Sequence, residues 1–385
     1  MAVGSEPVRH RSLATGVLLF LAAVDAAGYS VIAPVLPVIA QQTGASPTTI
    51  GWLAAVFPLT MLPGLAASGW LIRRGQLRLV LVSSLVIVVV GSLGFVLTTS
   101  LPALFAARAL MGFGSGGLWM AVTLRTLEYF PHEGYQAMSR VYAAYSLGAL
   151  IGPAIGSLPG VRAPFGAYVA LLMIGVVAAL ALPAPAAAMA YVADHSWRRN
   201  VGFWYAGVAI MLGMLSVGLI DGVLPLHFAT LLDQWQIGLL YVATAVVTAA
   251  AAVVAGHLRA VVALVVGVAA LFVGLALAGA TASVAWWVTG LALIGLSAGS
   301  VQTGSTGILL EQVPTDRIVG AMTVWSQLGI LGYFLAPAMG GVIAENIGYQ
   351  ALGLVPLLLV VPLVVLGVVT RRQVSGSRTD RAAAR

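Results

Sequence analysis

Long apolar stretches alternate with short polar connections along most of the chain. About 17–25 apolar residues suffice to cross a bilayer as a helix. Stretches of this kind lie at 13–39, 48–71, 79–99, 102–128, 138–160, 164–184, 201–226, 237–256, 260–281, 284–310, 318–343 and 348–370. The pattern predicts an all-α membrane protein with twelve transmembrane helices in two bundles of six. We expect an N-terminal bundle over 1–184, a cytoplasmic linker over 185–200, a C-terminal bundle over 201–370 and a cytoplasmic tail over 371–385.

The composition indicates that the chain is solvated by lipid. Of its 385 residues, 61% are hydrophobic and 8% are charged, and the mean hydropathy is +1.04. A soluble domain carries about 25% charged residues. The chain contains no cysteine, which excludes disulfides, thiol nucleophiles and thiolate metal sites.

The basic residues follow the membrane topology. The formal net charge is +7, and all eighteen basic residues are arginine. They do not gather in one domain as a nucleic-acid-binding surface would, so we expect no nucleic-acid partner. All except Arg108 and Arg162 fall in connections on one side of the predicted bundle or in the tail. Because cytoplasmic loops are enriched in arginine, we predict that both termini are cytoplasmic, in the plasma (inner) membrane. The arginine- and alanine-rich composition is typical of a bacterial protein from a GC-rich genome.

The two predicted bundles share an internal repeat. The stretch from Ile50 aligns with the stretch from Ile237, and GALIGPAIG from Gly148 aligns with GYFLAPAMG from Gly332. In a third match, EYFP from Glu128 aligns with EQVP from Glu311. The offsets lie between 183 and 187 residues. A parallel duplication of this kind is typical of transporters with a central cleft between two bundles.

The segment GALIGPAIG combines regularly spaced glycines with a proline: Gly148, Gly152, Pro153 and Gly156. In lipid, small residues four apart let a neighbouring helix pack closely. A proline bends the helix and frees a carbonyl, which is tolerated where other helices shield it. Pro337 is the equivalent proline in the second bundle. The segment is interpreted as a packed hinge, and the alternative is an ordinary packing face.

A second motif, Arg108-x-x-x-Gly112-x-Gly114, lies in the stretch 102–128. A cation at mid-bilayer costs at least about 2.5–3.5 kcal/mol, so it normally faces a cavity or a partner. The alternative is an arginine that extends to the membrane surface. The glycines formally match a dinucleotide fingerprint, but no strand precedes them, which excludes that interpretation.

A third motif is the connection GWLIRRGQLR, which runs from Gly69 to Arg78. With the two motifs above, it makes the chain resemble the major facilitator superfamily over its whole length. More narrowly, the chain resembles the twelve-helix drug:proton antiporters of that superfamily. The resemblance implies that the glycine–proline segment is a hinge that limits leak and that Arg108 takes part in proton transfer.

The connection departs from the family pattern, in which an acidic residue helps to latch the cytoplasmic side. Here Arg73 replaces the acid, and Gly75 comes one residue early. A swapped pair, in which Arg73 or Arg74 meets Asp316, is one possible latch. The alternative is a merely basic cytoplasmic loop. The predicted gate residues are Gly69, Arg73, Arg74, Gly75, Arg78 and Asp316.

Two acidic residues lie within predicted spans. Asp25 is near the middle of the first span, where a carboxyl group can load and release protons because its charged form is poorly solvated. Asp221 is the second candidate, although the repeat places it eight residues beyond the equivalent of Asp25. The predicted proton-coupling residues are therefore Asp25, Arg108 and Asp221. The alternatives are a structural role for Asp25 and a solvated position for Asp221.

The predicted substrate cavity is apolar with a few polar groups. Its candidate residues are Tyr29, Trp119, Tyr142, Met211, Met214, Gln302, Trp325, Gln327 and Tyr333. No nucleotide-binding, hydrolase or metal-ligand motif appears, so we expect neither an enzyme nor a cofactor or metal.

We predict a monomeric secondary transporter that works by alternating access and exports a small, largely apolar organic molecule in exchange for protons. The alternatives are proton-coupled uptake of a small metabolite and a transport-inactive membrane sensor or scaffold.

Overall fold

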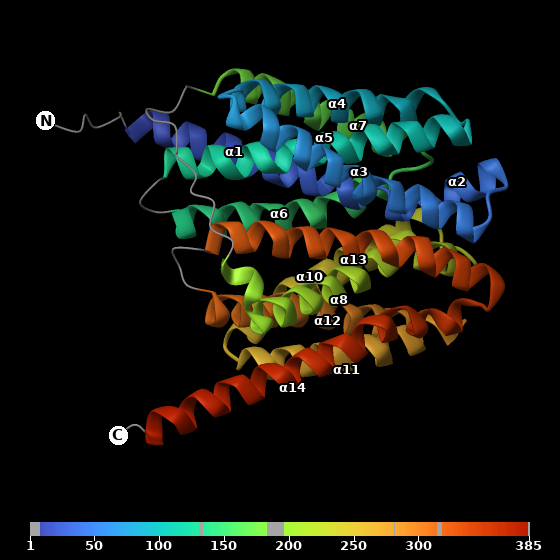
Figure 1. The fold of residues 1–385 in the computed structure, drawn as a ribbon. Helices are drawn as coiled ribbons and strands as arrows, with labels where there is room; N and C mark the ends of the chain where they lie inside the picture. The colour runs from blue at the N-terminus through green and yellow to red at the C-terminus, as the bar shows by residue number, and fades with distance from the viewer. Residues whose placement is uncertain (1–7, 131–133, 183–195, 281, 314–317, 384–385) are drawn as a thin grey trace, which may run out of the picture. The chain divides into compact units, whose positions relative to one another are not determined.

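The chain is helical throughout its described part. The computed structural model describes residues 8–130, 134–182, 196–280, 282–313 and 318–383, and these residues form long helices joined by short turns (Figure 1). No strand occurs within these ranges. The all-α prediction is therefore confirmed.

The helices belong to two compact units. The first contains α1 (Val8–Ser30), the 3-10 helix η1 (Ala33–Val35), α2 (Leu36–Thr43), α3 (Pro47–Arg73), α4 (Leu77–Leu97), α5 (Leu101–Tyr129), α6 (Gly134–Gly156) and α7 (Arg162–Leu180). The second contains η2 (Ser196–Arg199), α8 (Val201–Gly222), α11 (Ala260–Ala280), α12 (Val284–Gln312), α13 (Ile318–Asn346), η4 (Tyr349–Gly353) and α14 (Leu354–Ala383).

Two further helices, α9 (Leu224–Phe228) and α10 (Gln234–Gly256), contribute residues to both units. The segment Phe228–Ala245 belongs to the first unit, although the expected domain boundaries assign it to the C-terminal bundle. The helix α14 continues to Ala383, through most of the segment expected as a tail.

Ten helical segments among the described residues are long and apolar enough to cross a bilayer. Two long helices are not among them: α5, which carries Arg108, Arg125 and Glu128, and α6, which is strongly apolar only over Ala143–Gly156. The chain is therefore a multi-pass membrane protein, and the count of twelve spans stays a prediction.

Prolines interrupt the first helical segment of each unit at matching places. The first segment passes from α1 through η1 to α2, with Pro34 in η1 and Pro37 at the start of α2. In the second unit, α8 gives way to α9, whose second residue is Pro225. A proline fits the first turn of a helix because the N–H groups of that turn have no intrahelical acceptor, so the N–H that proline lacks is not needed. The break at the end of α1 leaves carbonyls open to other partners.

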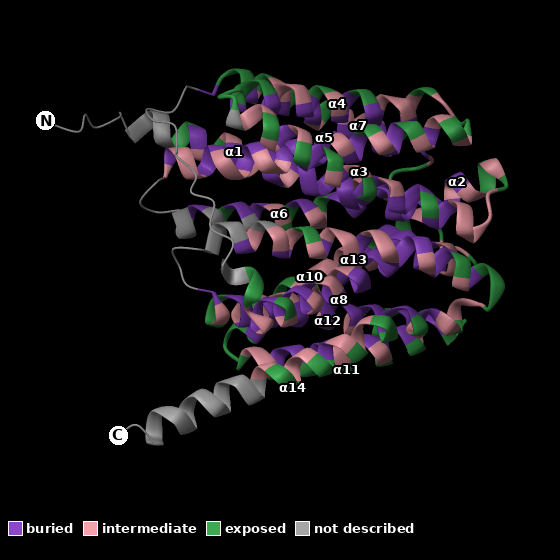
Figure 2. Ribbon diagram, viewed as in Figure 1, coloured by how far each residue is buried: buried purple, intermediate pink, exposed green. Residues whose placement is uncertain are grey.

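The helices differ in how many of their residues are buried (Figure 2). The most apolar window of the α8–α9 segment is 78% buried, whereas the window over η4 and α14 is 22% buried. The exposed side chains of α14 are nevertheless apolar, as at Val361 and Leu358. Apolar residues on an exposed face fit a lipid solvent.

The glycines of the Arg108 motif are packing positions. A Cβ at Gly112 would collide with the Phe57 carbonyl of α3, and one at Gly114 would lie 2.8 Å from the Ser84 carbonyl of α4. The helix α5 therefore lies between α3 and α4 at close backbone distance, as small residues allow in membranes. This packing holds Arg108 in the interior of the first unit.

Candidate functional site

Asp25 lies on α1 in the interior of the first unit, with 2% of its surface exposed. Within the described part of the chain, neither carboxylate oxygen has a hydrogen-bond partner of good geometry. Ser115 of α5, also 2% exposed, is the side chain placed to hydrogen-bond the carboxyl group. A buried polar group without a hydrogen bond is uncommon and calls for an explanation.

Arg108 is fully buried on α5 and binds the end of α1. Its Nη1 donates to the Gly28 carbonyl at 3.2 Å, and its Nη2 donates to the Tyr29 carbonyl at 3.3 Å. The guanidinium carbon lies 4.2 Å from the ring centre of Phe57. Carbonyls in the last turn of a helix lack intrahelical partners and favour a cation. Arg108 therefore caps α1 one turn beyond Asp25 and does not extend to the surface.

Tyr168 of α7 joins this cluster, although the sequence analysis did not single it out. Its side chain is 1% exposed, and its hydroxyl occupies the place where a Cβ at Gly28 would stand. Asp25, Arg108 and Tyr145 are its charged or titratable neighbours. A tyrosine in an apolar helix gives no local signal of such a role, and only the packing of α7 against α1 reveals it.

Aromatic side chains surround the cluster. Tyr29 is 8% exposed, and its ring packs edge-on against the ring of Phe57, with 6.1 Å between the ring centres. Trp119 of α5 meets Tyr145 of α6 edge-on at 5.1 Å. The structure thus brings Asp25, Arg108 and Tyr29 together in one unit. The side chain of Tyr142, another predicted substrate residue, lies outside the described residues.

In the second unit, Asp221 of α8 is 6% exposed, and its Oδ2 accepts a hydrogen bond from the Tyr333 hydroxyl at 3.3 Å. Tyr333, on α13, is 3% exposed. Asp221 is therefore a buried, hydrogen-bonded acid in this structure. It differs in this respect from Asp25.

The remaining predicted substrate residues of the second unit are buried or half-buried, except for one that is exposed. The Nε2 of Gln302 on α12 donates a hydrogen bond to the sulfur of Met214 at 3.2 Å. A thioether sulfur is a weak acceptor. Met211 is half-buried, and Trp325 is 8% exposed with no hydrogen-bond partner for its indole nitrogen among the described residues. Gln327 is exposed and does not join them.

The glycines of α6 pack directly against the backbone of α1. A Cβ at Gly148 would collide with the Ala23 carbonyl, and one at Gly152 would lie 2.7 Å from the Ala27 carbonyl. At Gly156 it would lie 2.5 Å from the carbonyl of Val31. These three positions form one continuous contact line along the helix that carries Asp25.

The second unit repeats this contact. A Cβ at Gly332 of α13 would collide with the Met211 carbonyl of α8, as Gly148 would with Ala23. Pro153 and Pro337 occupy the interior of α6 and α13, and both helices continue past them. The aligned glycines therefore have matching neighbours in both units.

A side-chain clasp joins α10 to the turn after α6. The amide of Gln234 donates to the carbonyls of Gly156 and Gly160 at 2.8 and 2.9 Å, and its oxygen accepts from the Gly160 N–H at 2.9 Å. One turn later, a Cβ at Gly238 would lie 2.9 Å from the Pro153 carbonyl. These contacts explain why the start of α10 belongs to the first unit.

The predicted gate is only partly described. Gly75 closes the α3–α4 turn with φ +77°, a conformation that favours glycine. The guanidinium carbon of Arg74 lies 3.7 Å from the ring centre of Trp70, and Arg78 donates to the Leu180 carbonyl at 2.9 Å. Gly69 is half-buried in the last turns of α3. The side chain of Arg73 and all of Asp316 lie outside the described residues, so the swapped pair stays a prediction.

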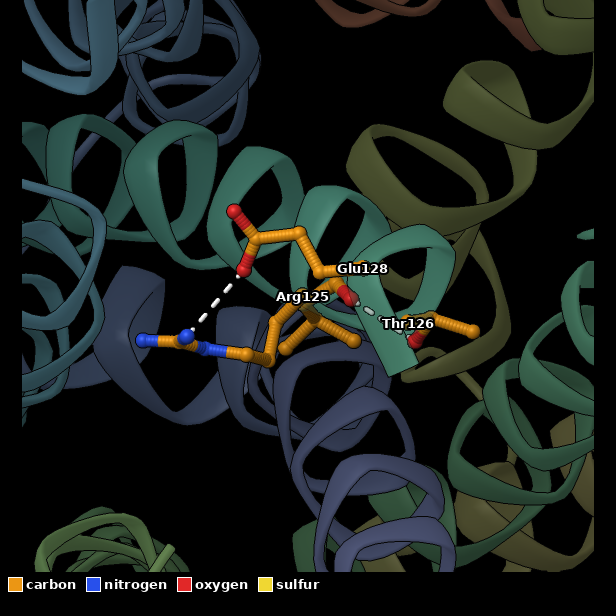
Figure 3. A network of polar contacts seen from close by, with 4 residues as sticks. Arg125, Thr126 and Glu128 are labelled. Atoms are coloured by element: carbon orange, nitrogen blue, oxygen red, sulfur yellow. Dashed lines mark hydrogen bonds and ion pairs between the residues drawn. The ribbon is translucent and has the colours of Figure 1, made fainter. Parts of the chain in front are cut away.

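An ion pair closes the last turn of α5 (Figure 3). Arg125 Nη1 lies 3.1 Å from Glu128 Oε2, and the two side chains are 8% and 12% exposed. The Thr126 hydroxyl between them donates to the Val122 carbonyl at 2.8 Å. The pair neutralises two charges at the end of the helix that carries Arg108.

Part of the chain is similar to a known family and to named relatives. Residues 18–196 match the model of the Major Facilitator Superfamily. Relatives named as multidrug resistance protein MdtD occur in Escherichia fergusonii and in Escherichia coli O81. Each is 33% identical over 130 residues, and the match covers 34% of this chain. The matched stretch spans 28% of the relatives' length.

Solved structures share the fold over nearly the whole chain. A bacterial homologue of the human lysosomal transporter Spinster is 15% identical with a TM-score of 0.72, covering 94% of this chain and 96% of that one. A POT family transporter is 14% identical with a TM-score of 0.74, covering 93% and 96%. A D-xylose–proton symporter is 14% identical with a TM-score of 0.71, covering 91% and 97%.

At these identities the structures establish the fold alone, and the similarity to the family rests on residues 18–196 and on the related sequences. The superfamily consists of transporters and not of enzymes. Over residues 18–196, the chain is therefore similar to the major facilitator superfamily.

Proposed function

We propose that the protein exports a small, largely apolar organic molecule by alternating access and takes up protons in exchange. The observation that carries the proposal is Asp25, a buried carboxyl group without a hydrogen-bond partner among the described residues. Arg108 binds carbonyls of Gly28 and Tyr29, one turn further along the same helix.

A proton carrier needs two opposing influences on its carboxyl group. Burial disfavours the charged carboxylate, and a nearby cation favours it. A change in the distance or solvation of either group between two transport states would then load or release one proton. The proton gradient provides about 2.3 kcal/mol per charge for each 100 mV of membrane potential, so no cofactor is needed.

Two observations support export of an organic molecule. The contact line of Gly148, Gly152 and Gly156 along α1 corresponds to the segment in which the chain resembles drug:proton antiporters. The related sequences carry the name of a multidrug resistance protein. The substrate residues proposed are those of the predicted cavity. Seven of them are buried or half-buried: Tyr29, Trp119, Met211, Met214, Gln302, Trp325 and Tyr333.

We also propose a bacterial inner-membrane location with both termini in the cytoplasm, and a monomeric state. The arginine distribution supports the orientation. The hinge role of Pro153 and Pro337 and the gate role of the α3–α4 turn belong to the same proposal.

Flux in vesicles tests the proposal and separates its alternatives. A thermal-shift screen of lipophilic compounds on the purified protein supplies a ligand, and its movement is then followed in reconstituted vesicles with imposed pH gradients. Exchange predicts that ligand and protons move in opposite directions. Movement in the same direction would establish proton-coupled uptake. A ligand that binds but never moves would favour a sensor or scaffold.

A further inference from the structure

Tyr168 is buried in the first unit, close to a stacked pair of phenylalanines. Three residues earlier on α7, the ring of Phe165 stacks on the ring of Phe95 from α4. The ring centres are 4.1 Å apart and the interplanar angle is 11°. Both phenylalanines are 0% exposed, and Tyr168 is 1% exposed. The α4–α7 contact therefore fixes the direction from which the tyrosine ring reaches α1.

Gly28 provides the room for the Tyr168 hydroxyl. Any side chain at residue 28 would occupy the position of that hydroxyl oxygen. Gly28 is also the residue whose carbonyl accepts from Arg108, and it lies three residues after Asp25. Residues three apart on a helix lie on the same face. The hydroxyl thus stands on the α1 face that carries both Asp25 and the Arg108 anchor.

The polar groups around Asp25 and Tyr168 come from each helix packed against α1. Ser115 of α5 interacts with Asp25, and Tyr168 of α7 has Asp25, Arg108 of α5 and Tyr145 of α6 as its charged or titratable neighbours. The guanidinium of Arg108 is already engaged with two carbonyls and the Phe57 ring. A phenol can donate a hydrogen bond to a carboxylate and can accept one from a protonated carboxyl group. Tyr168 can therefore serve Asp25 in either protonation state.

We propose that Tyr168 is a positioning residue for proton coupling, whose hydroxyl donates a hydrogen bond to Asp25 when that carboxyl group is charged. The inference rests on the proposed role of Asp25. No covalent bond of the tyrosine changes: the proton leaves the Asp25 oxygen for water, and the phenol keeps its own proton while its O–H turns toward the carboxylate.

Infrared difference spectroscopy tests this without a substrate. The full-length protein in lipid is titrated with acid, and the C=O band of the protonated Asp25 is assigned as the band that Asp25→Asn removes. A hydrogen bond to a charged acceptor contributes about 1.5–3 kcal/mol, and 1.36 kcal/mol corresponds to one pH unit. Tyr168→Phe should therefore move the titration midpoint of this band by about one to two units to higher pH.

Tyr129→Phe is the matched control, because it removes the hydroxyl of another buried tyrosine of the same unit, 4% exposed at the end of α5. It should leave the midpoint unchanged. An unchanged midpoint in Tyr168→Phe would overturn the inference while leaving Asp25 as a proton carrier. Absence of any titrating Asp25 band in the unmodified protein would overturn the proposed function as well.

A second measurement covers the case in which Tyr168→Phe does not fold. In the unmodified protein with isotope-labelled tyrosine, a tyrosine ring band should shift as Asp25 titrates. The shift should be absent in Asp25→Asn. A shift that persists in Asp25→Asn, or no shift in the unmodified protein, would contradict the proposed hydrogen bond.

Discussion

Gly28 illustrates at the scale of one residue how the first unit is built. A glycine inside a transmembrane helix could serve flexibility, packing or a ligand, and the sequence does not distinguish these roles. The structure does, because the Tyr168 hydroxyl fills the space beside it and Arg108 binds its carbonyl. Asp25 could be singled out from the sequence because an acid in an apolar span is costly. Tyr168 could not, because its role depends on which helix lies opposite.

Gly28→Ala should destabilise the protein by about 1–3 kcal/mol, since an added methyl group in a filled space forces its neighbours to move. Gly16→Ala on the same helix is the control, because nothing lies within 4 Å of a Cβ there. The control should be neutral or gain up to about 1 kcal/mol from helix propensity. Denaturant unfolding in detergent measures both. Equal effects of the two substitutions would contradict the close fit at Gly28.

At the scale of helices, hydrophobic length was sufficient to predict most elements. The breaks near Pro34 and Pro225 were not predicted, because the apolar stretches continue through both prolines. The assignment of the start of α10 to the first unit was not predicted. It depends on the Gln234 clasp, in which one polar side chain meets backbone groups more than seventy residues away in sequence. Hydropathy carries no information on such a contact.

Gln234→Leu should cost about 1–3 kcal/mol, because it keeps the side-chain volume and leaves half-buried backbone groups without their partners. Gln76→Leu is the control, since Gln76 is exposed and its side chain makes no capping hydrogen bond at the start of α4. Thermal unfolding in lipid nanodiscs compares the two. A loss in Gln76→Leu as large as that in Gln234→Leu would assign the effect to surface hydrophobicity.

Gly152→Leu tests the contact line between α6 and α1. The larger side chain would meet the Ala27 carbonyl and Ser30, so it should impair ligand flux more than expression. Leu150→Met on the same helix conserves volume and should be tolerated. Flux in vesicles, normalised to the amount of folded protein, is the readout. Tolerance of both substitutions would reduce the glycine–proline segment to an ordinary packing face.

At the scale of the whole molecule, the two units share contacts that follow from the sequence repeat, as at Gly148 and Gly332. They differ in chemistry: the first unit holds an acid without a hydrogen-bond partner among the described residues, and the second holds Asp221 bonded to Tyr333. The repeat predicts the scaffold but not this difference, because a few side chains decide it. This difference is the reason why we propose proton exchange in the first unit.

The orientation of the whole molecule is testable because the chain has no native cysteine. Cysteines introduced one at a time at Ser46 and at Ala187, which lies outside the described residues, should react with a membrane-impermeant reagent from opposite sides. We expect Ser46→Cys to label from outside and Ala187→Cys only after the membrane is opened. Labelling of both from the same side would contradict the predicted topology.

The most direct test of the account is gradient-driven flux of a bound ligand in vesicles containing Asp25→Asn. The substitution keeps the shape and removes the exchangeable proton, so binding of a neutral ligand should survive and its pH dependence should flatten. Movement driven by an imposed pH gradient should be lost. Asp233→Asn alters an exposed acid just before α10, and this control should retain gradient-driven movement. Full gradient-driven transport by Asp25→Asn would contradict the central claim that proton coupling runs through the buried carboxyl group of α1.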